Sequence, residues 1–159
     1  TICAYENDII FQHLIRGKVE MDSKQLKVGN VMSTDVLTLG RNDKLKIAED
    51  LMKQGRIRHL PVLNDDGDLC GIVTQRDLFR GALLRALGFG SRAEEKILNT
   101  IVVKEVMTDD VQTTTPDTPL VEAANLMIEH KIGCLPVVDG NRLVGILSEG
   151  DFVKLATQY

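Results

Sequence analysis

The sequence predicts an α+β fold built from two copies of one unit, with the element order strand, helix, strand, strand, helix. The first observation is an internal repeat, because Gly71-Ile72-Val73-Thr74-Gln75-Arg76-Asp77 returns as Gly145-Ile146-Leu147-Ser148-Glu149-Gly150-Asp151. The second is that residues upstream of both copies also match in order, beginning with Val31-Met32 and Val106-Met107. The third is a change of hydrophobic period from strand-like to helical within each copy. Together these observations indicate a duplicated α+β unit.

Local patterns place the elements of the first copy. Val36 to Leu39 is expected to form a strand, and the spacing of Leu45, Ala48 and Met52 predicts a helix that stops at Gly55. The remaining elements are expected at 58–63 (strand), 64–67 (turn), 69–73 (strand) and 75–86 (helix). In the second copy Thr118-Pro119 is expected to begin the first helix, because proline suits the first helical position.

The repeats divide the chain into four predicted segments. Polar connectors and glycine breaks give their boundaries. The segments are 1–27 (a helix at 8–16 and a connector), 28–87 (first repeat), 88–102 (a linker helix opened by the capping box Ser91 to Glu94) and 103–159 (second repeat).

Composition narrows the class of partner. The chain has 159 residues, of which 43% are hydrophobic and 26% charged, as in a soluble globular protein. The net charge of −4 argues against binding to nucleic acid or to an acidic membrane surface. No apolar run approaches the roughly 20 residues that span a bilayer. The three cysteines lack the spacing of metal ligands and are interpreted as reduced thiols, which favours a cytoplasmic location.

The duplicated motif places a hydroxyl residue where a strand ends and a carboxylate three residues later. Thr74 with Asp77, and Ser148 with Asp151, can each form a capping box at the start of a helix, which requires no ligand. The same geometry can also hold a nucleotide. A helix N-terminus attracts phosphate, and a carboxylate can accept hydrogen bonds from both ribose hydroxyls.

These motifs resemble those of the cystathionine-β-synthase (CBS) domain, which occurs in tandem pairs. The resemblance rests on Val31-Met32, Arg58-His59-Leu60-Pro61-Val62 and the motif 71–77, with their counterparts Val106-Met107, Gly133-Cys134-Leu135-Pro136-Val137 and 145–151. It implies β-α-β-β-α units with small mixed sheets that pack about a pseudo-twofold axis, and a homodimer formed through exposed helices. It also implies binding of AMP, ADP, ATP, S-adenosylmethionine or NAD(H), and signalling to an unidentified regulated protein.

Two sets of binding residues are expected, one for each copy. Pro61 and Pro136 are expected to follow a strand and to leave backbone groups near Leu60 and Leu135 open to the adenine edge. The resemblance also adds apolar residues to each site, although apolar residues more often belong to the hydrophobic core. The first set is Val36, Thr38, Ile57, Arg58, His59, Leu60, Pro61, Thr74, Arg76 and Asp77. The second set is Val111, Thr113, Ile132, Gly133, Cys134, Leu135, Pro136, Ser148 and Asp151.

The copies differ in charge. The first carries Arg56, Arg58, His59 and Arg76, where the second has Lys131, Gly133, Cys134 and Gly150. Because arginine forks hold phosphate well, we expect the first site to take phosphates and the second to stay empty or to prefer a less charged adenosyl compound. The alternative is that these arginines only solvate an exposed face.

Three classes of function remain open. The sequence shows no nucleophile paired with a base, no metal-ligand cluster and no phosphate-binding glycine loop, so no catalytic residue, metal or catalytic cofactor is expected. The favoured interpretation is a non-catalytic regulatory module that binds an adenosine-containing ligand, most readily an adenosine nucleotide, in the cleft between the two repeats and signals to a partner by a conformational change. The alternatives are a dimerisation scaffold with vestigial sites and an enzyme that acts on nucleotides.

Overall fold

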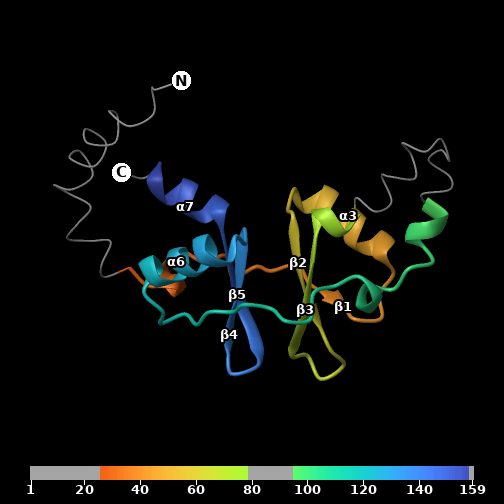
Figure 1. Cartoon of the computed structure of the whole chain (residues 1–159), viewed down its shortest axis with the longest axis horizontal. Coiled ribbons are helices and arrows are strands. Elements are labelled where there is room, and N and C mark those ends of the chain that lie inside the picture. The colour runs from red at the N-terminus through yellow and green to blue at the C-terminus, as the bar shows by residue number, and fades with distance from the viewer. Residues whose placement is uncertain (1–25, 79–94, 158–159) are drawn as a thin grey trace.

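The computed structural model describes residues 26–78 and 95–157, which form an α+β structure of two halves side by side (Figure 1). The helix expected at 8–16, the capping box at Ser91 and most of the helix expected at 75–86 lie outside the described residues. Within the described ranges, the helices are too short or too polar to cross a lipid bilayer.

The first repeat contributes a short opening turn, a three-stranded sheet and one long helix. Its elements are η1 (Val28–Asn30), β1 (Leu39–Gly40), α3 (Leu45–Gly55), β2 (His59–Leu63) and β3 (Leu69–Thr74). β1 runs parallel to β2, and β2 runs antiparallel to β3. The helix ends as predicted at Gly55, where Arg56 takes the left-handed conformation with φ of 50° and donates its N–H to the Met52 carbonyl.

The second repeat has a similar order of elements. Its elements are η2 (Val103–Glu105), α6 (Leu120–His130), β4 (Cys134–Asp139), β5 (Arg142–Ser148) and α7 (Glu149–Ala156). β4 and β5 form an antiparallel hairpin, and Thr114 extends it by one parallel bridge to Val137. Pro119 occupies the position just before α6 rather than the first helical position that the sequence analysis assigned to it. The predicted duplication of the unit is confirmed.

One strand prediction needs correction. The strand expected from Val36 is shorter, because only Leu39 and Gly40 pair with β2. The upstream residues instead run toward the other half, where Ser33 exchanges two hydrogen bonds of 2.9 Å with Ile146. The equivalent segment of the second repeat pairs Thr108 with Ile72 at 3.0 Å.

The positions of the prolines agree with the strand predicted at 58–63, and not with the expectation that they follow a strand. Pro61 is inside β2 and Pro136 is inside β4, both almost completely buried. Pro136 lies opposite Ile146, whose N–H and carbonyl already bond to Ser33, so this pair exchanges no hydrogen bonds. The proline nitrogen therefore faces the outer edge of the hairpin, where no ladder bond is lost.

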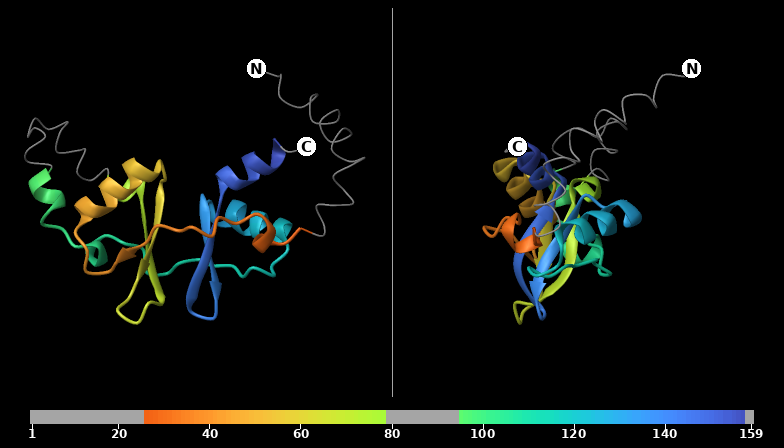
Figure 2. Two further views of the ribbon diagram at one scale, coloured as in Figure 1. Left: turned by 180° about the vertical axis from the view of Figure 1, so that it is seen from behind. Right: turned by 90° about the vertical axis from the view of Figure 1, so that its left-hand side faces the viewer.

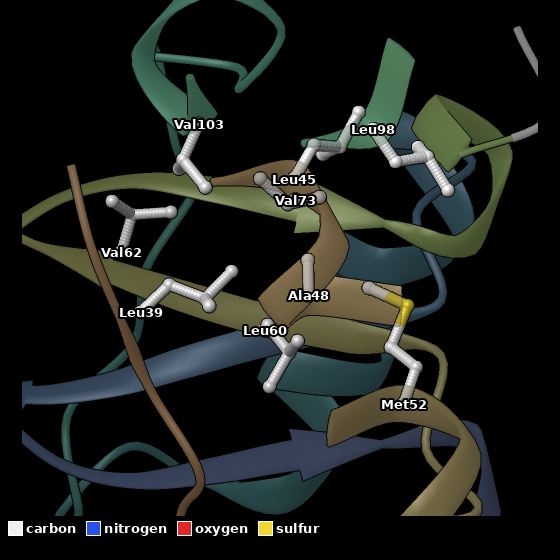
Figure 3. Close-up of a cluster of buried hydrophobic side chains, with 9 residues drawn as sticks. All are labelled: Leu39, Leu45, Ala48, Met52, Leu60, Val62, Val73, Leu98 and Val103. Atoms are coloured by element: carbon white, nitrogen blue, oxygen red, sulfur yellow. The ribbon is translucent and has the colours of Figure 1, made fainter. Parts of the chain in front are cut away.

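The hydrophobic cores cross the repeat boundary. η2 lies beside β1 and α3 of the first half, and η1 lies beside α6 of the second half (Figures 1 and 2). Val103 is fully buried in the cluster drawn in Figure 3, together with Leu39, Leu45, Ala48, Met52, Leu60, Val62, Val73 and Leu98. Val28 is fully buried in the corresponding cluster of the second half. Each repeat thus supplies its opening turn to the core of the other.

Two glycines permit this exchange. A Cβ placed on Gly71 would lie 2.6 Å from Sδ of Met107, and a Cβ on Gly145 would lie 2.6 Å from Sδ of Met32. The Gly145 position is also 3.1 Å from the backbone oxygen of Ser33. Methionine can change rotamer, whereas a hydrogen-bonded backbone oxygen moves only with its strand.

We expect Gly145→Ala to destabilise the protein by about 1–3 kcal/mol, as overpacked sites do, and Gly71→Ala to cost less. Met107→Ala should restore most of the stability lost in Gly71→Ala, while Met32→Ala should restore only part of that lost in Gly145→Ala. Urea unfolding of the four single and two double variants measures this. Equal costs at the two glycines, or complete rescue at both, would contradict the role of the Ser33 backbone.

Candidate functional site

The two hydroxyl–carboxylate corners form as capping boxes. The backbone N–H and Oγ1 of Thr74 donate to Oδ2 of Asp77 at 2.7 and 2.8 Å. The backbone N–H and Oγ of Ser148 donate to Oδ2 of Asp151 at 2.8 and 2.7 Å. The structural interpretation of the motif is therefore confirmed at both places, and it leaves the ligand interpretation open.

The Asp151 carboxylate accepts hydrogen bonds from residues of both repeats. It is 3% exposed, and its Oδ1 accepts hydrogen bonds from Lys154 at 3.0 Å and from Ser33 of the first repeat at 3.3 Å. Burial, the largest single influence, would raise the pKa of Asp151. The bonds from Ser148 and Lys154 together outweigh burial, so the pKa lies below its ordinary value.

A cavity of about 480 Å³ opens between the two repeats. The first repeat supplies the end of β3, the first residues of the helix that follows it and the start of β2, namely Arg58, His59, Ile72, Thr74, Gln75 and Arg76. The second repeat supplies the segment after Met107, the residues leading into β4 and the first residue of α7, namely Thr108, Asp110, Val111, Gln112, Lys131, Ile132, Gly133, Cys134 and Glu149. The volume lies within the range of about 300–1,000 Å³ that small-molecule sites occupy.

The cavity therefore combines residues from both predicted sets. It brings Arg58, His59, Thr74 and Arg76 of the first set together with Val111, Ile132, Gly133 and Cys134 of the second. The grouping follows from the exchanged segments, because Thr108 pairs with Ile72 and carries the next residues across to the Thr74 corner. The other corner, Ser148 with Asp151, faces Ser33 of the first repeat.

The remaining predicted residues do not line this cavity. Leu60, Pro61, Leu135 and Pro136 have side chains buried in the core, because they occupy interior strand positions. Thr113 lines a separate groove beside α6. Asp77 lies behind Thr74, to which it is hydrogen bonded. Val36, Thr38 and Ile57 lie in the first repeat outside the lining.

Several lining residues were not predicted from the sequence. Thr108, Asp110 and Gln112 follow the Val106-Met107 pair. Gln75 and Glu149 lie within the two corner motifs, and Ile72 lies two residues before the first of them. Glu149 could have been found by comparing the copies, since Gln75 stands in its place in the first.

Cationic groups are unevenly distributed around the cavity. Arg58, Arg76 and Lys131 carry positive charge, and Glu149 lies 3.8 Å from the Arg58 guanidinium. Burial lowers the pKa of His59, and the neighbouring Arg58 lowers it further, so the imidazole is neutral at pH 7. Burial raises the pKa of the Cys134 thiol to about 12, so this thiol stays protonated and is a poor nucleophile. Among the described residues, no three His, Cys, Asp or Glu side chains gather as a metal site.

A sequence profile of the family described as CBS domain matches residues 28–83 and 103–157. The chain belongs to the CBS domain family. The resemblance and the α+β fold class predicted from the sequence are thus confirmed.

Known CBS domain proteins differ in length and in bound ligand. The chain is 37% identical over 129 residues to homoserine O-acetyltransferase from Methanococcoides burtonii, and the match covers 80% of this chain and 24% of that protein. This CBS chain therefore spans about a quarter of the length of that relative.

Two solved CBS structures contain adenosyl compounds. The CBS domain pair of protein MJ0100, in complex with 5′-methylthioadenosine and S-adenosyl-L-methionine, has a TM-score of 0.67 and 28% identity over 84% of this chain and 97% of its own. CBSX2, in complex with AMP, has a TM-score of 0.68 and 29% identity over 83% of this chain and 96% of its own. These ligands belong to those proteins.

We expect Asp151→Asn to destabilise the protein at pH 7 by about 1–2 kcal/mol, as loss of a helix cap does. Because the folded-state pKa of Asp151 is lowered, its contribution is present above the unfolded-state value of about 4 and is lost as the pH falls through the folded-state value. The gap between wild type and variant in urea unfolding should therefore narrow below about pH 4. A gap that stays constant from neutral to strongly acidic pH would contradict an ionised cap.

Proposed function

We propose that the cavity between the repeats binds an adenosine-containing ligand and that the protein is a regulatory module rather than an enzyme. One observation carries the proposal. Thr74, the apolar Val111 and Ile132, and the cation Arg58 border a single cavity, although they come from different repeats, and Asp77 holds the Thr74 hydroxyl in place. A ribose hydroxyl, a purine face and a phosphate would each meet a suitable group there.

The ligand is proposed by charge. Arg58, Arg76 and Lys131 favour a compound that carries phosphate, so AMP, ADP or ATP comes before S-adenosylmethionine, and NADH is a further candidate. The Ser148–Asp151 corner contains Gly150 in the place of Arg76, and Gly133 stands in the place of Arg58. We propose that this second corner takes a less charged adenosyl compound, as the MJ0100 structure with 5′-methylthioadenosine suggests.

A route for signalling follows from the exchange of opening turns between the repeats. A ligand in the cavity would contact the first repeat at Arg76 and the second at Ile132. It would change the relative position of the two repeats only if it bound one arrangement of them more tightly than another. The regulated protein is proposed to be a further domain or a separate partner. The homoserine O-acetyltransferase relative, about four times as long as its matching part, supports the first of these.

A homodimer is proposed through α6 and α7. Ile128 is 74% exposed and borders a groove with Phe152, Ala124 and Met127. Lys131 and Glu149 lie at the same groove, so a twofold axis could place opposite charges of the two copies against each other. The first repeat has Lys53 at the position of Ile128. The apolar face therefore belongs to α6 and not to α3, and the proposed occupant is a second copy of this chain.

We expect AMP at 100 times its dissociation constant to stabilise the protein by about 2.7 kcal/mol, seen as a rise in Tm. Asp77→Asn should weaken AMP binding about tenfold, because the Asp77 carboxylate accepts the hydrogen bonds that position Thr74 at the cavity, and hydrogen bonds to a charged group contribute about 1.5–3 kcal/mol. Calorimetry measures both, with Asp66→Asn in the exposed β2–β3 turn as the matched control. The absence of any Tm shift with AMP, ADP, ATP, S-adenosylmethionine and NADH would favour the scaffold with vestigial sites.

We expect Ile128→Asp to convert a dimer into a folded monomer, because it places a charge at the centre of the α6–α7 groove. Sedimentation equilibrium at micromolar concentration measures the change. Ile47→Asp on α3, where the isoleucine is 43% exposed, is the control and should leave the dimer intact. A wild-type monomer, or equal effects of both substitutions, would contradict this interface.

A further inference from the structure

Glu149 is an acidic residue at the edge of a cavity otherwise furnished with cations. It is the first residue of α7, and its N–H donates to the Gly133 carbonyl at 3.1 Å. Its carboxylate lies 3.8 Å from Nη2 of Arg58, which comes from the other repeat. Both side chains are about two-thirds exposed, so the contact itself adds little stability.

The pseudo-twofold relation shows that this acid is specific to one repeat. In the first repeat, Gln75 donates its N–H to the Arg58 carbonyl at 2.8 Å, the same bond that Glu149 makes to Gly133. Gln75 and Glu149 are therefore structural equivalents, as are Arg58 and Gly133. One repeat combines an arginine with a neutral amide, and the other combines a glycine with a carboxylate.

Gly133 brings these groups together. A Cβ at this position would lie 3.3 Å from the His59 ring and 3.6 Å from the Glu149 carboxyl carbon. Any side chain at position 133 would separate the Glu149 carboxylate from His59 in β2 of the first repeat. The glycine thus lets Glu149 lie beside His59 and Arg58 at the cavity.

We propose that Glu149 is a specificity-determining residue that limits the number of phosphates the cavity accepts. This inference rests on the proposed function. Without ligand, the carboxylate partly neutralises Arg58. With ligand, it competes for the same guanidinium and repels each added phosphate charge, while it has no such effect on an uncharged adenosine. The cavity therefore favours adenosine compounds with few phosphates over the triphosphate.

Glu149 has a simpler role that must be separated from this one. An acidic residue in the first turn of a helix stabilises it through the helix dipole. That role predicts a change in protein stability after substitution, but no change in preference among ligands that differ only in phosphate number. The ratio of two affinities therefore distinguishes the two roles.

The test uses Glu149→Gln, which restores the residue that the first repeat carries and keeps the side-chain size. Dissociation constants for adenosine, AMP and ATP are measured by calorimetry without Mg²⁺, so that the phosphates keep their full charge. We expect the ratio of ATP affinity to AMP affinity to rise about three- to tenfold, and to return toward the wild-type ratio at high salt. Glu122→Gln on α6 removes the same charge away from the cavity and should leave the ratio unchanged.

The outcomes separate this inference from the proposed function. If adenosine compounds bind the wild type but Glu149→Gln leaves the ATP to AMP ratio unchanged, the role of Glu149 is wrong and the binding proposal stands. An equal change in the Glu122→Gln variant would reduce the effect to net charge and overturn the inference. If adenosine, AMP and ATP all fail to bind the wild type, both proposals fall.

Discussion

Met107 lies against Gly71, and Met32 lies against Gly145, and the arrangement of the whole molecule depends on these two contacts. Each places the opening turn of one repeat on the sheet of the other. A Cβ added to either glycine would lie only 2.6 Å from the methionine Sδ. The backbone bonds from Ile72 to Thr108 and from Ile146 to Ser33 continue the same contacts. Neither half completes its core without the other, so folding and association of the repeats are one event.

The cavity is a consequence of this exchange. The segment that enters from the second repeat at Thr108 continues to Val111, which places an apolar wall opposite the Thr74 corner of the first repeat. A corner motif alone is a helix cap, as the short bonds within Thr74–Asp77 show. It becomes part of a small-molecule site only because another repeat supplies the facing surface.

The sequence was sufficient for the elements but not for their partners. The period of Leu45, Ala48 and Met52 predicted α3, and all three side chains are buried. The duplicated motif predicted both caps. A repeat, however, does not show whether Val31-Met32 packs on its own sheet or on that of the other copy, because both sheets offer an equivalent glycine. Each predicted set of site residues was therefore drawn from a single copy, whereas the cavity in the structure combines residues from both copies.

The two repeats depart from pseudo-twofold symmetry in the charge of equivalent side chains at the cavity. The backbone N–H groups of Gln75 and Glu149 are bonded alike, since they donate to the carbonyls of Arg58 and Gly133, the residues just before β2 and β4. The side chains differ, because one repeat presents Arg58 where the other presents Gly133. Both copies exchange the same turns, so packing of these turns does not account for the difference in charge around the cavity. The different ligand charges proposed for the two corners would account for it, because a charged neighbour favours or disfavours phosphate.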